Sequence, residues 1–492
     1  MASQSTFRLG DWVADWGVQF GTSGARGLVA NMTSDVCHAY ASAFLIAVAR
    51  GARRVVIGHD LRPSSPRIAA ACADAARQAG VEPVFVGALP TPAIAHYAAS
   101  LGAPAIVVTG SHIPFDRNGI KFYRAQGEIT KPDEQAMLDA QVRAVEDFEP
   151  SALPPVAPAA VSQWIGRYVD FCGPGALAGL RIAVYEHSSV ARDLLRTILE
   201  RLGASVLSLG RTDTFVPIDT EAVRPEDVEQ AARWADAHRF DAILSTDGDA
   251  DRPLIGDERG RWLRGDVVGI LCARWLGADT VATPVSSNTA VERCGAFARV
   301  LRTRIGSPYV IEAMETAAAG DAAGVVVGYE ANGGFLLGTA VQRGGRRLDA
   351  LPTRDAILPM LALLLAAREQ GLKLSALAAD LPARFTASDR LQAFDGARSR
   401  ALIAVLERDL ALAARTLAPD SGPVVAVDTT DGLRVSFACG DIVHLRPSGN
   451  APELRCYVEA DDPARAGQLC SECLARIADG GDCAIDPVRP QA

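Results

Sequence analysis

The chain has 492 residues, more than one hydrophobic core usually accommodates, so several domains are expected. Hydrophobic residues make up 49% and charged residues 22%, a balance that is typical of globular proteins and argues against disorder in the bulk of the chain. The net charge of -9 argues against nucleic acid and against an anionic membrane surface as the main partner, because both favour a basic face.

The N-terminal segment has no basic region followed by an apolar core, so it does not resemble a secretion signal. The longest apolar stretch, near 356–367, contains Pro359 and is too short to span a bilayer. We therefore expect a cytoplasmic protein without a membrane partner. The 10 cysteines are expected to be free thiols, and the one CxxC pair, Cys470 and Cys473, lies in a helical pattern with no second pair at zinc spacing.

Short β-branched runs alternate with alanine-rich helical stretches from about residue 53 to residue 330. This rhythm, with apolar strands, indicates α/β domains with mainly parallel, mixed sheets. The predicted strands and their exit loops are RRVVIGHD, VEPVFVGAL, APAIVVTG, LRIAVYE, ASVLSLG, FDAILSTDGD, DTVATPVSS, RVLRTRIGS and AGVVVGYE.

The C-terminal part has a different pattern. The segment 398–416 is predicted to form one amphipathic helix, and a final helix is predicted to end near Ala478. Four strands come close together between them, which favours an α+β domain with an antiparallel sheet. Those strands are VVAVDTT, GLRVSFA, DIVHLRPS and ELRCYVEA.

We therefore predict three α/β domains followed by one α+β domain. A segment rich in proline and alanine at 150–160 indicates a linker after the first domain. The predicted domains are 1–155, 161–264, 265–382 and 383–492.

The loop that follows AIVVT contains a candidate nucleophile or phosphoryl carrier. Gly110 permits a sharp turn, from which Ser111 can project at the end of the strand. Lys121 lies ten residues later beside two aromatic residues, a setting that can lower a lysine pKa towards acid or base function. The alternative is an ordinary Ser/Gly turn with a surface lysine.

Three aspartates alternate in the loop after FDAILST, namely Asp247, Asp249 and Asp251. In an extended loop they would point to one side, and such a cluster repels itself unless a cation such as Mg²⁺ or Ca²⁺ binds there. An EF-hand is excluded because Arg252 stands where that loop needs glycine. A solvated acidic loop is the alternative.

Three further loops combine groups that bind sugars or phosphates. Glu330 and Asn332 precede two glycines and could hold sugar hydroxyls, or the segment could be a glycine hairpin. A turn near the C-terminus has the groups that bind a phosphate dianion, unless its arginines form salt bridges; they are Arg446, Ser448, Gly449, Asn450 and Arg455. The N-terminal GTSGARG could bring Arg26 to a phosphate, although taken alone this spacing favours a tight turn.

In this order the loops resemble those of the α-D-phosphohexomutase superfamily, which comprises phosphomannomutases, phosphoglucomutases and phosphoglucosamine mutases. The similar motifs extend from residue 20 to residue 455, so the resemblance covers nearly the whole chain. The motifs are FGTSGARG, the phosphoserine loop TGSHIPFDRNGIKF, the metal loop DGDADR, the sugar loop GYEANGG and the phosphate loop RPSGNAPELR. The resemblance implies four domains around a central cleft.

The resemblance also implies a role for each loop. Ser111 would be phosphorylated and would share an Mg²⁺ ion with Asp247, Asp249 and Asp251. The other residues near the transferred phosphoryl group would be Lys121 as the proton-transfer lysine, His112, Arg252 and Arg26. The sugar would contact Glu330 and Asn332, and its distal phosphate would contact Arg446, Ser448, Gly449, Asn450 and Arg455.

The implied reaction interconverts hexose 1-phosphate and hexose 6-phosphate through a hexose 1,6-bisphosphate, which also serves as activator. The expected partner is thus a hexose phosphate, and the expected assembly is a monomer or a weak homodimer. The sequence departs from the common family pattern at Ile113, Asn332, Gly334 and Asn450, where asparagine, serine, histidine and threonine are frequent.

Phosphoglucosamine mutases usually carry alanine where this chain has Gly110. We therefore rank phosphomannomutase first, phosphoglucomutase or dual specificity second and phosphoglucosamine mutase third. A non-catalytic sugar-phosphate binder would be favoured if Ser111, Lys121 or a loop aspartate were missing, and each is present. A phosphatase that uses Ser111 would differ only in that water takes the phosphoryl group.

Overall fold

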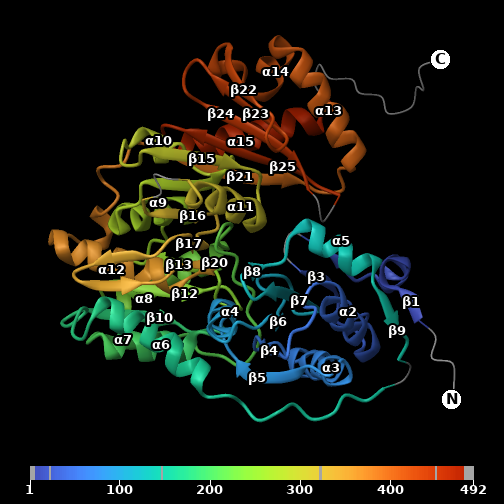
Figure 1. Ribbon diagram of the computed structural model, residues 1–492. Coiled ribbons are helices and arrows are strands. Elements are labelled where there is room, and N and C mark those ends of the chain that lie inside the picture. The colour runs from blue at the N-terminus through green and yellow to red at the C-terminus, as the bar shows by residue number, and fades with distance from the viewer. Residues whose placement is uncertain (1–5, 22–23, 146–147, 321–323, 449–451, 481–492) are drawn as a thin grey trace, which may run out of the picture. The chain divides into compact units, whose positions relative to one another are not determined.

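The computed structural model describes residues 6–21, 24–145, 148–320, 324–448 and 452–480. The chain divides into two compact units, whose elements are labelled in Figure 1. The first unit comprises Met1–Val281 and Ile311–Ala379, and the second comprises Ala282–Val310 and Asp380–Ala492. The chain passes between the units within β14 (Thr280–Pro284) and within α11 (Ser307–Ala318).

The first sheet of the first unit has the strand order β2-β3-β7-β6-β4-β5, with β8 paired to β7. Strand β4 runs parallel to β5 and β6, whereas β7 runs antiparallel to β3 and β6. The strands are β2 (Gln19–Phe20), β3 (Ala25–Leu28), β4 (Arg54–His59), β5 (Glu82–Ala88), β6 (Ala105–Val108), β7 (Arg117–Arg124) and β8 (Gly127–Glu128).

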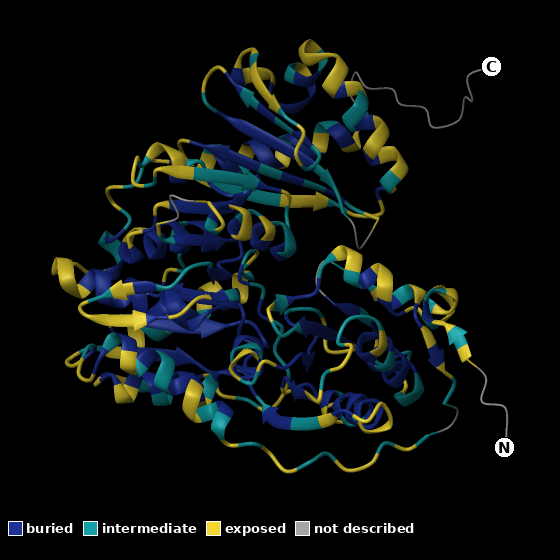
Figure 2. Cartoon of the chain, viewed as in Figure 1, coloured by how far each residue is buried: buried dark blue, intermediate teal, exposed yellow. Residues whose placement is uncertain are grey.

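Helices cover both faces of this sheet, which explains why its central strands are apolar without alternation. Val55, Val56 and Ile57 are consecutive residues of β4, and all three are buried. The neighbouring strand β6 is also buried along its length, whereas β5 at the edge of the sheet is only partly buried (Figure 2). The helices of this part are α1 (Val13–Trp16), α2 (Ser34–Ala47), α3 (Ser65–Gln78), α4 (Thr91–Ser100) and α5 (Lys131–Asp139); β1 (Thr6–Arg8) pairs with β9 (Gln141–Arg143), and η1 (Leu9–Asp11) is a 3-10 helix.

The second sheet of the first unit has the order β11-β10-β12-β13, in which the first three strands are parallel and β13 is antiparallel. Residues 148–157, between the two sheets in sequence, form no helix or strand, as expected for the predicted linker. The elements are β10 (Arg181–Tyr185), β11 (Ser205–Leu209), β12 (Ala242–Thr246), β13 (Pro253–Gly256), α6 (Ala159–Cys172), α7 (Arg192–Arg201) and α8 (Pro225–Ala237).

The rest of the first unit contains three antiparallel strands in the order β16-β17-β20. A helix that is apolar on all sides, α12, packs against α9 and is buried along most of its length. The elements are β16 (Val326–Tyr329), β17 (Phe335–Leu337), β18 (Val341–Arg343), β19 (Arg346–Leu348), β20 (Leu351–Asp355), α9 (Gly265–Leu276), α12 (Ile357–Gln370) and η2 (Leu374–Ala376).

The second unit contains the predicted antiparallel sheet, in the order β21-β25-β24-β23-β22. Burial alternates along β23, as expected for a sheet with one face towards a core. The elements are β15 (Arg299–Thr303), β21 (Phe385–Leu391), β22 (Val424–Asp428), β23 (Leu433–Phe437), β24 (Ile442–Pro447), β25 (Leu454–Ala460), α10 (Ala290–Arg293), α13 (Gly396–Arg408), α14 (Leu410–Leu417), η3 (Pro419–Ser421) and α15 (Pro463–Ala478).

The fold class is confirmed, but one predicted element is wrong. The single helix predicted at 398–416 is two helices, α13 and α14, separated at Asp409. Asp409 has extended backbone angles, and its carboxylate accepts a hydrogen bond from Leu412 N, so it caps the second helix instead of continuing the first. The residue boundaries of the four domains stay predictions.

Within the described ranges, no helix has the length and apolar character needed to cross a bilayer.

Burial of histidine makes the stability of the second unit depend on pH. Burial is the main reason that the pKa of His444 falls from 6.5 to about 4, although its Nε2 lies 2.5 Å from the carbonyl oxygen of Asp431. Between these two pH values, His444 is protonated in the unfolded chain but stays neutral in the folded chain. Stability is therefore complete above pH 6.5 and is lost as the pH falls through that range.

We expect His444→Gln to reduce the loss of thermal stability on going from about pH 7.5 to about pH 5, because glutamine does not titrate. A glutamine amide can still donate to the Asp431 carbonyl. The measurement is the midpoint of thermal unfolding of wild type and variant at both pH values. A variant that loses as much stability as wild type would contradict this explanation.

Candidate active site

Ser111 lies in the first unit, at the carboxyl end of β6, and its side chain is buried. Its φ of 52° is in the left-handed region, which is unusual for a residue with a side chain and is typical of strained functional turns. The hydroxyl Oγ donates to Asp247 Oδ2 at 2.7 Å and lies 3.2 Å from His112 Nδ1. The sequence therefore located a serine that is held directly against the acidic loop.

An arginine that the sequence analysis overlooked holds the Ser111 loop from beneath. The buried guanidinium of Arg62 donates to four backbone carbonyl oxygens of that loop, at 2.5–3.0 Å. The guanidinium also lies over the aromatic ring of Phe215 in a cation–π contact, with 4.1 Å between Arg62 Cζ and the ring centroid. A Cβ on Gly110 would lie 2.5 Å from the same Cζ, so the glycine is required by the arginine as well as by the turn. The sequence feature that could have indicated this role is the pair of charged residues Asp60 and Arg62, at and just after the end of the predicted segment RRVVIGHD.

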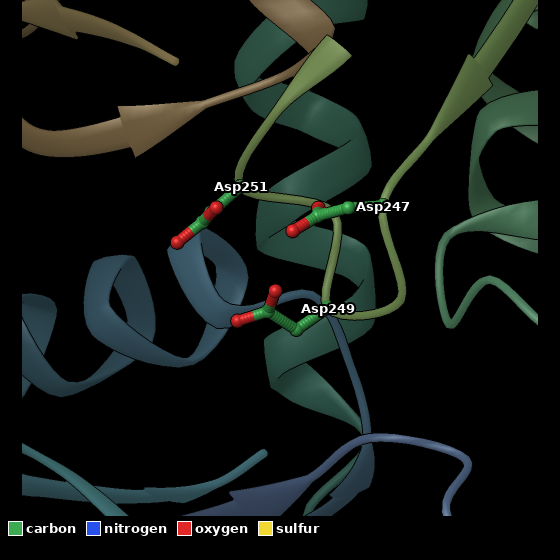
Figure 3. Close-up of side chains that lie close together, drawn as sticks. All are labelled: Asp247, Asp249 and Asp251. Carbon is green, nitrogen blue, oxygen red and sulfur yellow. The ribbon is translucent and has the colours of Figure 1, made fainter. Parts of the chain in front are cut away.

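The three aspartates lie together in the loop between β12 and β13 and are all buried (Figure 3). One carboxylate oxygen from each lies within 4.8 Å of the others. The prediction that they converge is confirmed, but the predicted extended loop is wrong. The segment is a turn, and Ala250 adopts a left-handed φ of 57° within it.

The hydrogen bonds of this loop leave two oxygens for a cation. Asp249 Oδ2 accepts from Thr91 Oγ1 at 2.6 Å and from Lys121 Nζ at 2.7 Å. Asp251 Oδ2 accepts from Lys121 Nζ at 2.7 Å and forms an ion pair with Arg354 Nη2 at 2.9 Å. The Oδ1 atoms of both aspartates are buried and accept no hydrogen bond from the described residues, although Asp251 Oδ1 lies 3.6 Å from Arg252 Nε. Since a buried carboxylate oxygen without a hydrogen bond is costly, these residues fit a divalent cation.

Charges within the cluster shift the pKa values of the aspartates in opposite directions. Burial, together with the negative charges of Asp249 and Asp251, raises the pKa of Asp247 well above its usual range. Burial acts the same way on Asp251, but Arg354 and Lys121 outweigh it and lower the pKa of that carboxyl. The pKa of Asp249 is also lowered, against burial and the charge of Asp251, by Lys121. The cluster thus contains one carboxyl group that ionises reluctantly and two that stay ionised.

Lys121 is buried on β7, and its environment differs from the predicted one. Burial alone would lower the pKa of its ammonium group, but the charges of Asp249 and Asp251 outweigh burial and raise it. The expectation of a lowered lysine pKa is therefore wrong for the protein without a bound cation, because the sequence did not place two carboxylates at 2.7 Å from Nζ.

Two predicted basic residues and a histidine complete the region around Ser111. Arg252 Nη1 lies 3.1 Å from His112 Nδ1, and burial followed by the charge of Arg252 lowers the pKa of His112 to about 3. Burial and the charges of Arg252 and Arg354 lower the pKa of Arg26 to about 10. Arg26 therefore stays cationic at neutral pH and lies within electrostatic range of the other two guanidinium groups.

Glu330 and Asn332 lie in the tight turn between β16 and β17, also within the first unit. The turn is closed by Gly333 N donating to the Glu330 carbonyl at 2.9 Å, with Gly333 at a φ of 87°. The segment is therefore a glycine-containing tight turn, and contact of Glu330 and Asn332 with a sugar stays a prediction. Asn332 Oδ1 accepts from Gly334 N at 2.9 Å, and Glu330 Oε2 accepts from Arg354 Nη1 at 3.0 Å.

The predicted phosphate loop lies in the second unit, between β24 and β25. Arg446 and Arg455 are directly opposite one another on these antiparallel strands, so their side chains leave the same face of the sheet. Arg446 Nε lies 2.9 Å from Asp431 Oδ2, and Ser448 N donates to the Glu453 carbonyl at 2.8 Å. Arg455 Nη2 lies 3.8 Å from Glu453 Oε2, so both arginines form the salt bridges that were the alternative, and the phosphate site stays a prediction. The predicted residues Gly449 and Asn450 lie outside the described residues.

Models of four successive domains match the chain. Three are described as phosphoglucomutase/phosphomannomutase, alpha/beta/alpha domains I, II and III, and match residues 17–148, 166–260 and 264–385. The fourth is described as the phosphoglucomutase/phosphomannomutase C-terminal domain and matches residues 384–476.

Named relatives match along almost the full length. A phosphomannomutase of Salmonella muenchen is 46% identical over 464 residues, covering 94% of this chain and 96% of the relative. A phosphomannomutase of Sinorhizobium fredii (strain NBRC 101917 / NGR234) is 47% identical over 470 residues, covering 93% and 98%. The crystal structure of a phosphoglucomutase/phosphomannomutase family protein from Burkholderia thailandensis has a TM-score of 0.72 at 22% identity, covering 94% of this chain and 98% of that chain.

We expect Asp249→Asn to weaken magnesium binding by at least about tenfold, because cation affinity depends on the number of charged oxygen ligands. The measurement is isothermal titration calorimetry with MgCl₂. Asp257→Asn is a matched control, since Asp257 is equally buried just after β13 but accepts hydrogen bonds from Arg259 N and Arg261 N. Equal affinities for wild type and Asp249→Asn would exclude this loop as the cation site.

Proposed function

This chain belongs to the phosphoglucomutase/phosphomannomutase family, and we propose that it interconverts mannose 6-phosphate and mannose 1-phosphate through a phosphoryl group carried on Ser111. It is a mutase and therefore an isomerase. The observation that carries the proposal is the buried hydroxyl of Ser111, 2.7 Å from Asp247 Oδ2 in a cluster that fits a cation. The two relatives at 46% and 47% identity support mannose as the hexose.

The proposed reaction consists of two phosphoryl transfers. In the first, the bond between phosphorus and Ser111 Oγ breaks and a bond to a sugar hydroxyl oxygen forms, so that the sugar becomes a hexose 1,6-bisphosphate. The sugar hydroxyl gives up its proton, and Ser111 Oγ regains one. The intermediate then reorients within the site, and its other phosphate is transferred to Ser111 by the reverse step. A hexose 1,6-bisphosphate is thus also the activator that first phosphorylates the serine.

We propose magnesium as the cation, held by Asp247, Asp249, Asp251 and an oxygen on Ser111. The Oδ1 atoms of Asp249 and Asp251, neither of which accepts a hydrogen bond from the described residues, support this assignment, because hard carboxylate oxygens suit magnesium. When bound, the ion supplies positive charge against the transferring phosphoryl oxygens and relieves the aspartate charge that keeps Lys121 protonated.

The chain's own cations surround the place of transfer. Lys121, whose Nζ lies 2.7 Å from both Asp249 Oδ2 and Asp251 Oδ2, is the proposed proton-transfer residue and would donate its proton to an oxygen that loses the phosphoryl group. Arg26 and Arg252 would balance phosphoryl charge without exchanging protons. His112 stays neutral at neutral pH, and its Nδ1 would accept a hydrogen bond from Arg252 Nη1 at 3.1 Å and so hold that guanidinium beside the phosphoserine.

The remaining predicted residues would hold the part of the substrate that does not react. Glu330 supplies a carboxylate and Asn332 an amide nitrogen for sugar hydroxyls. One distal phosphate site can serve both orientations of the intermediate, and its proposed residues are Arg446, Ser448, Gly449, Asn450 and Arg455.

Intact mass spectrometry of protein treated with hexose 1,6-bisphosphate tests the phosphoryl carrier. We expect wild type to gain one phosphoryl mass and Ser111→Ala to gain none. Ser245→Ala is the matched control, since Ser245 is also buried but donates to the Tyr185 carbonyl at 2.8 Å, and it should still gain the phosphoryl group. Wild-type protein that never accepts phosphate from a sugar bisphosphate would overturn the proposed function.

Turnover of three hexose 1-phosphates tests the sugar. With catalytic bisphosphate supplied, we expect the highest kcat/KM with mannose 1-phosphate, by about tenfold over glucosamine 1-phosphate, since a misplaced or altered hydroxyl leaves buried polar groups unpaired. Glucose 1-phosphate should fall between them. A strong preference for the glucosamine compound would refute the proposed specificity while leaving the phosphoserine chemistry intact.

A further inference from the structure

Arg354, which the sequence analysis overlooked, is a buried arginine at the end of β20. Its guanidinium bridges two loops that are distant in sequence. Nη1 donates to Glu330 Oε2 at 3.0 Å, while Nη2 lies 2.9 Å and Nε 3.2 Å from Asp251 Oδ2. One side chain thus contacts both the turn between β16 and β17 and the acidic loop.

The path of this side chain coincides with the space beside Gly334. A Cβ built on Gly334 would lie 2.6 Å from Arg354 Cδ and 2.9 Å from its Cγ, closer than real Cβ contacts occur. The nearest atoms belong to the stem of a side chain whose other end is fixed by two carboxylates, so the stem cannot simply move away. The φ of Gly334 is not positive, so it is the lack of space, and not the backbone conformation, that requires glycine here.

We propose that Arg354 is a positioning residue that fixes Glu330 and Asp251 relative to one another, and that Gly334 lacks a side chain so that Arg354 can pass. The proposal rests on the proposed mutase function, because it assigns these two carboxylates to the substrate sugar and to the cation. Glu330 and Asp251 are both buried, and a buried carboxylate needs a paired cation.

Arginine suits this position better than lysine would. The planar fork of a guanidinium can donate to two carboxylates at once with fixed geometry, whereas an ammonium group acts as a point charge. Lys121 Nζ already contacts Asp251 Oδ2 at 2.7 Å, so charge on the acidic loop is partly balanced without Arg354. What Arg354 adds is the link from that loop to Glu330.

A double-mutant cycle between Gly334→Ala and Arg354→Ala tests the proposal in the full-length enzyme with magnesium. We expect each single variant to raise KM for mannose 1-phosphate by about tenfold, with a smaller effect on kcat, because Glu330 loses its fixed position. Once Arg354→Ala has removed the stem, adding Gly334→Ala should change KM less than about twofold.

The variant Arg354→Lys separates the effect of the aliphatic part of the side chain from that of the guanidinium group. It retains Cγ and Cδ, so Gly334→Ala should remain as harmful in the lysine background as in wild type. It also retains the charge, so KM of Arg354→Lys alone should lie between wild type and Arg354→Ala.

Arg384→Met is the matched control for loss of a buried ion pair. Arg384 pairs with Glu459 in the second unit and is as buried as Arg354. The control should lower the midpoint of thermal unfolding but leave KM unchanged. If the role of Arg354 were merely structural, Arg354→Ala would have the same two effects. Additive effects of Gly334→Ala and Arg354→Ala on KM, or unchanged KM in both single variants, would overturn the proposal.

The outcome can be separated from failure of the proposed function. If wild type turns over hexose phosphates and the cycle is additive, only the role of Arg354 is refuted. If wild type shows no turnover, the proposed function fails, and additivity of the unfolding midpoints still decides whether Gly334 and Arg354 compete for one space: non-additive midpoints support that part and additive midpoints reject it.

Discussion

Three buried carboxylates within one loop are the constraint on which the rest of the first unit depends. Ionised groups this close together cannot be buried without positive charge around them. The fold supplies that charge from separate elements: Lys121 from β7, Arg354 from β20 and Arg252 from the loop itself. Lys121 lies within β7 and Arg354 near the end of β20, so both reach the acidic loop from strands whose neighbouring residues lie in the core.

The glycines of the site follow from the same constraint. The arginine side chain is long, so packing it against a loop requires a neighbouring residue without a side chain. Gly110 leaves room for Arg62, which holds the carbonyl oxygens of the Ser111 turn, and Gly334 leaves room for Arg354. At Gly248 the neighbour is backbone, since a Cβ there would lie 2.9 Å from the Ser111 carbonyl oxygen. These glycines therefore allow charged groups and backbone to approach closely.

The sequence predicted what depends on local pattern. Apolar runs predicted the central strands, and polar groups at their ends indicated Ser111 and the aspartates, whereas β7, which carries Lys121, was not predicted. Arg62 and Arg354 were missed, because the pattern around an arginine near a strand end is the same whether its side chain reaches solvent or a distant carboxylate. The break at Asp409 was missed for the opposite reason: the apolar period continues across it, and only the capping bond to Leu412 N ends one helix and begins another.

The electrostatics also indicate why phosphorylation of Ser111 and cation binding should depend on one another. A phosphoryl group on Ser111 would bring a charge of about -2 to a position where Asp247 already ionises reluctantly, because of burial and the charges of Asp249 and Asp251. Arg26 and Arg252 would balance part of that charge, and a divalent cation would add positive charge directly beside Asp247. By thermodynamic reciprocity, the phosphorylated form should then bind the cation more tightly than the free serine form does. The acidic loop and the serine are thus one electrostatic unit, even though 135 intervening residues separate Ser111 from Asp247 in the sequence.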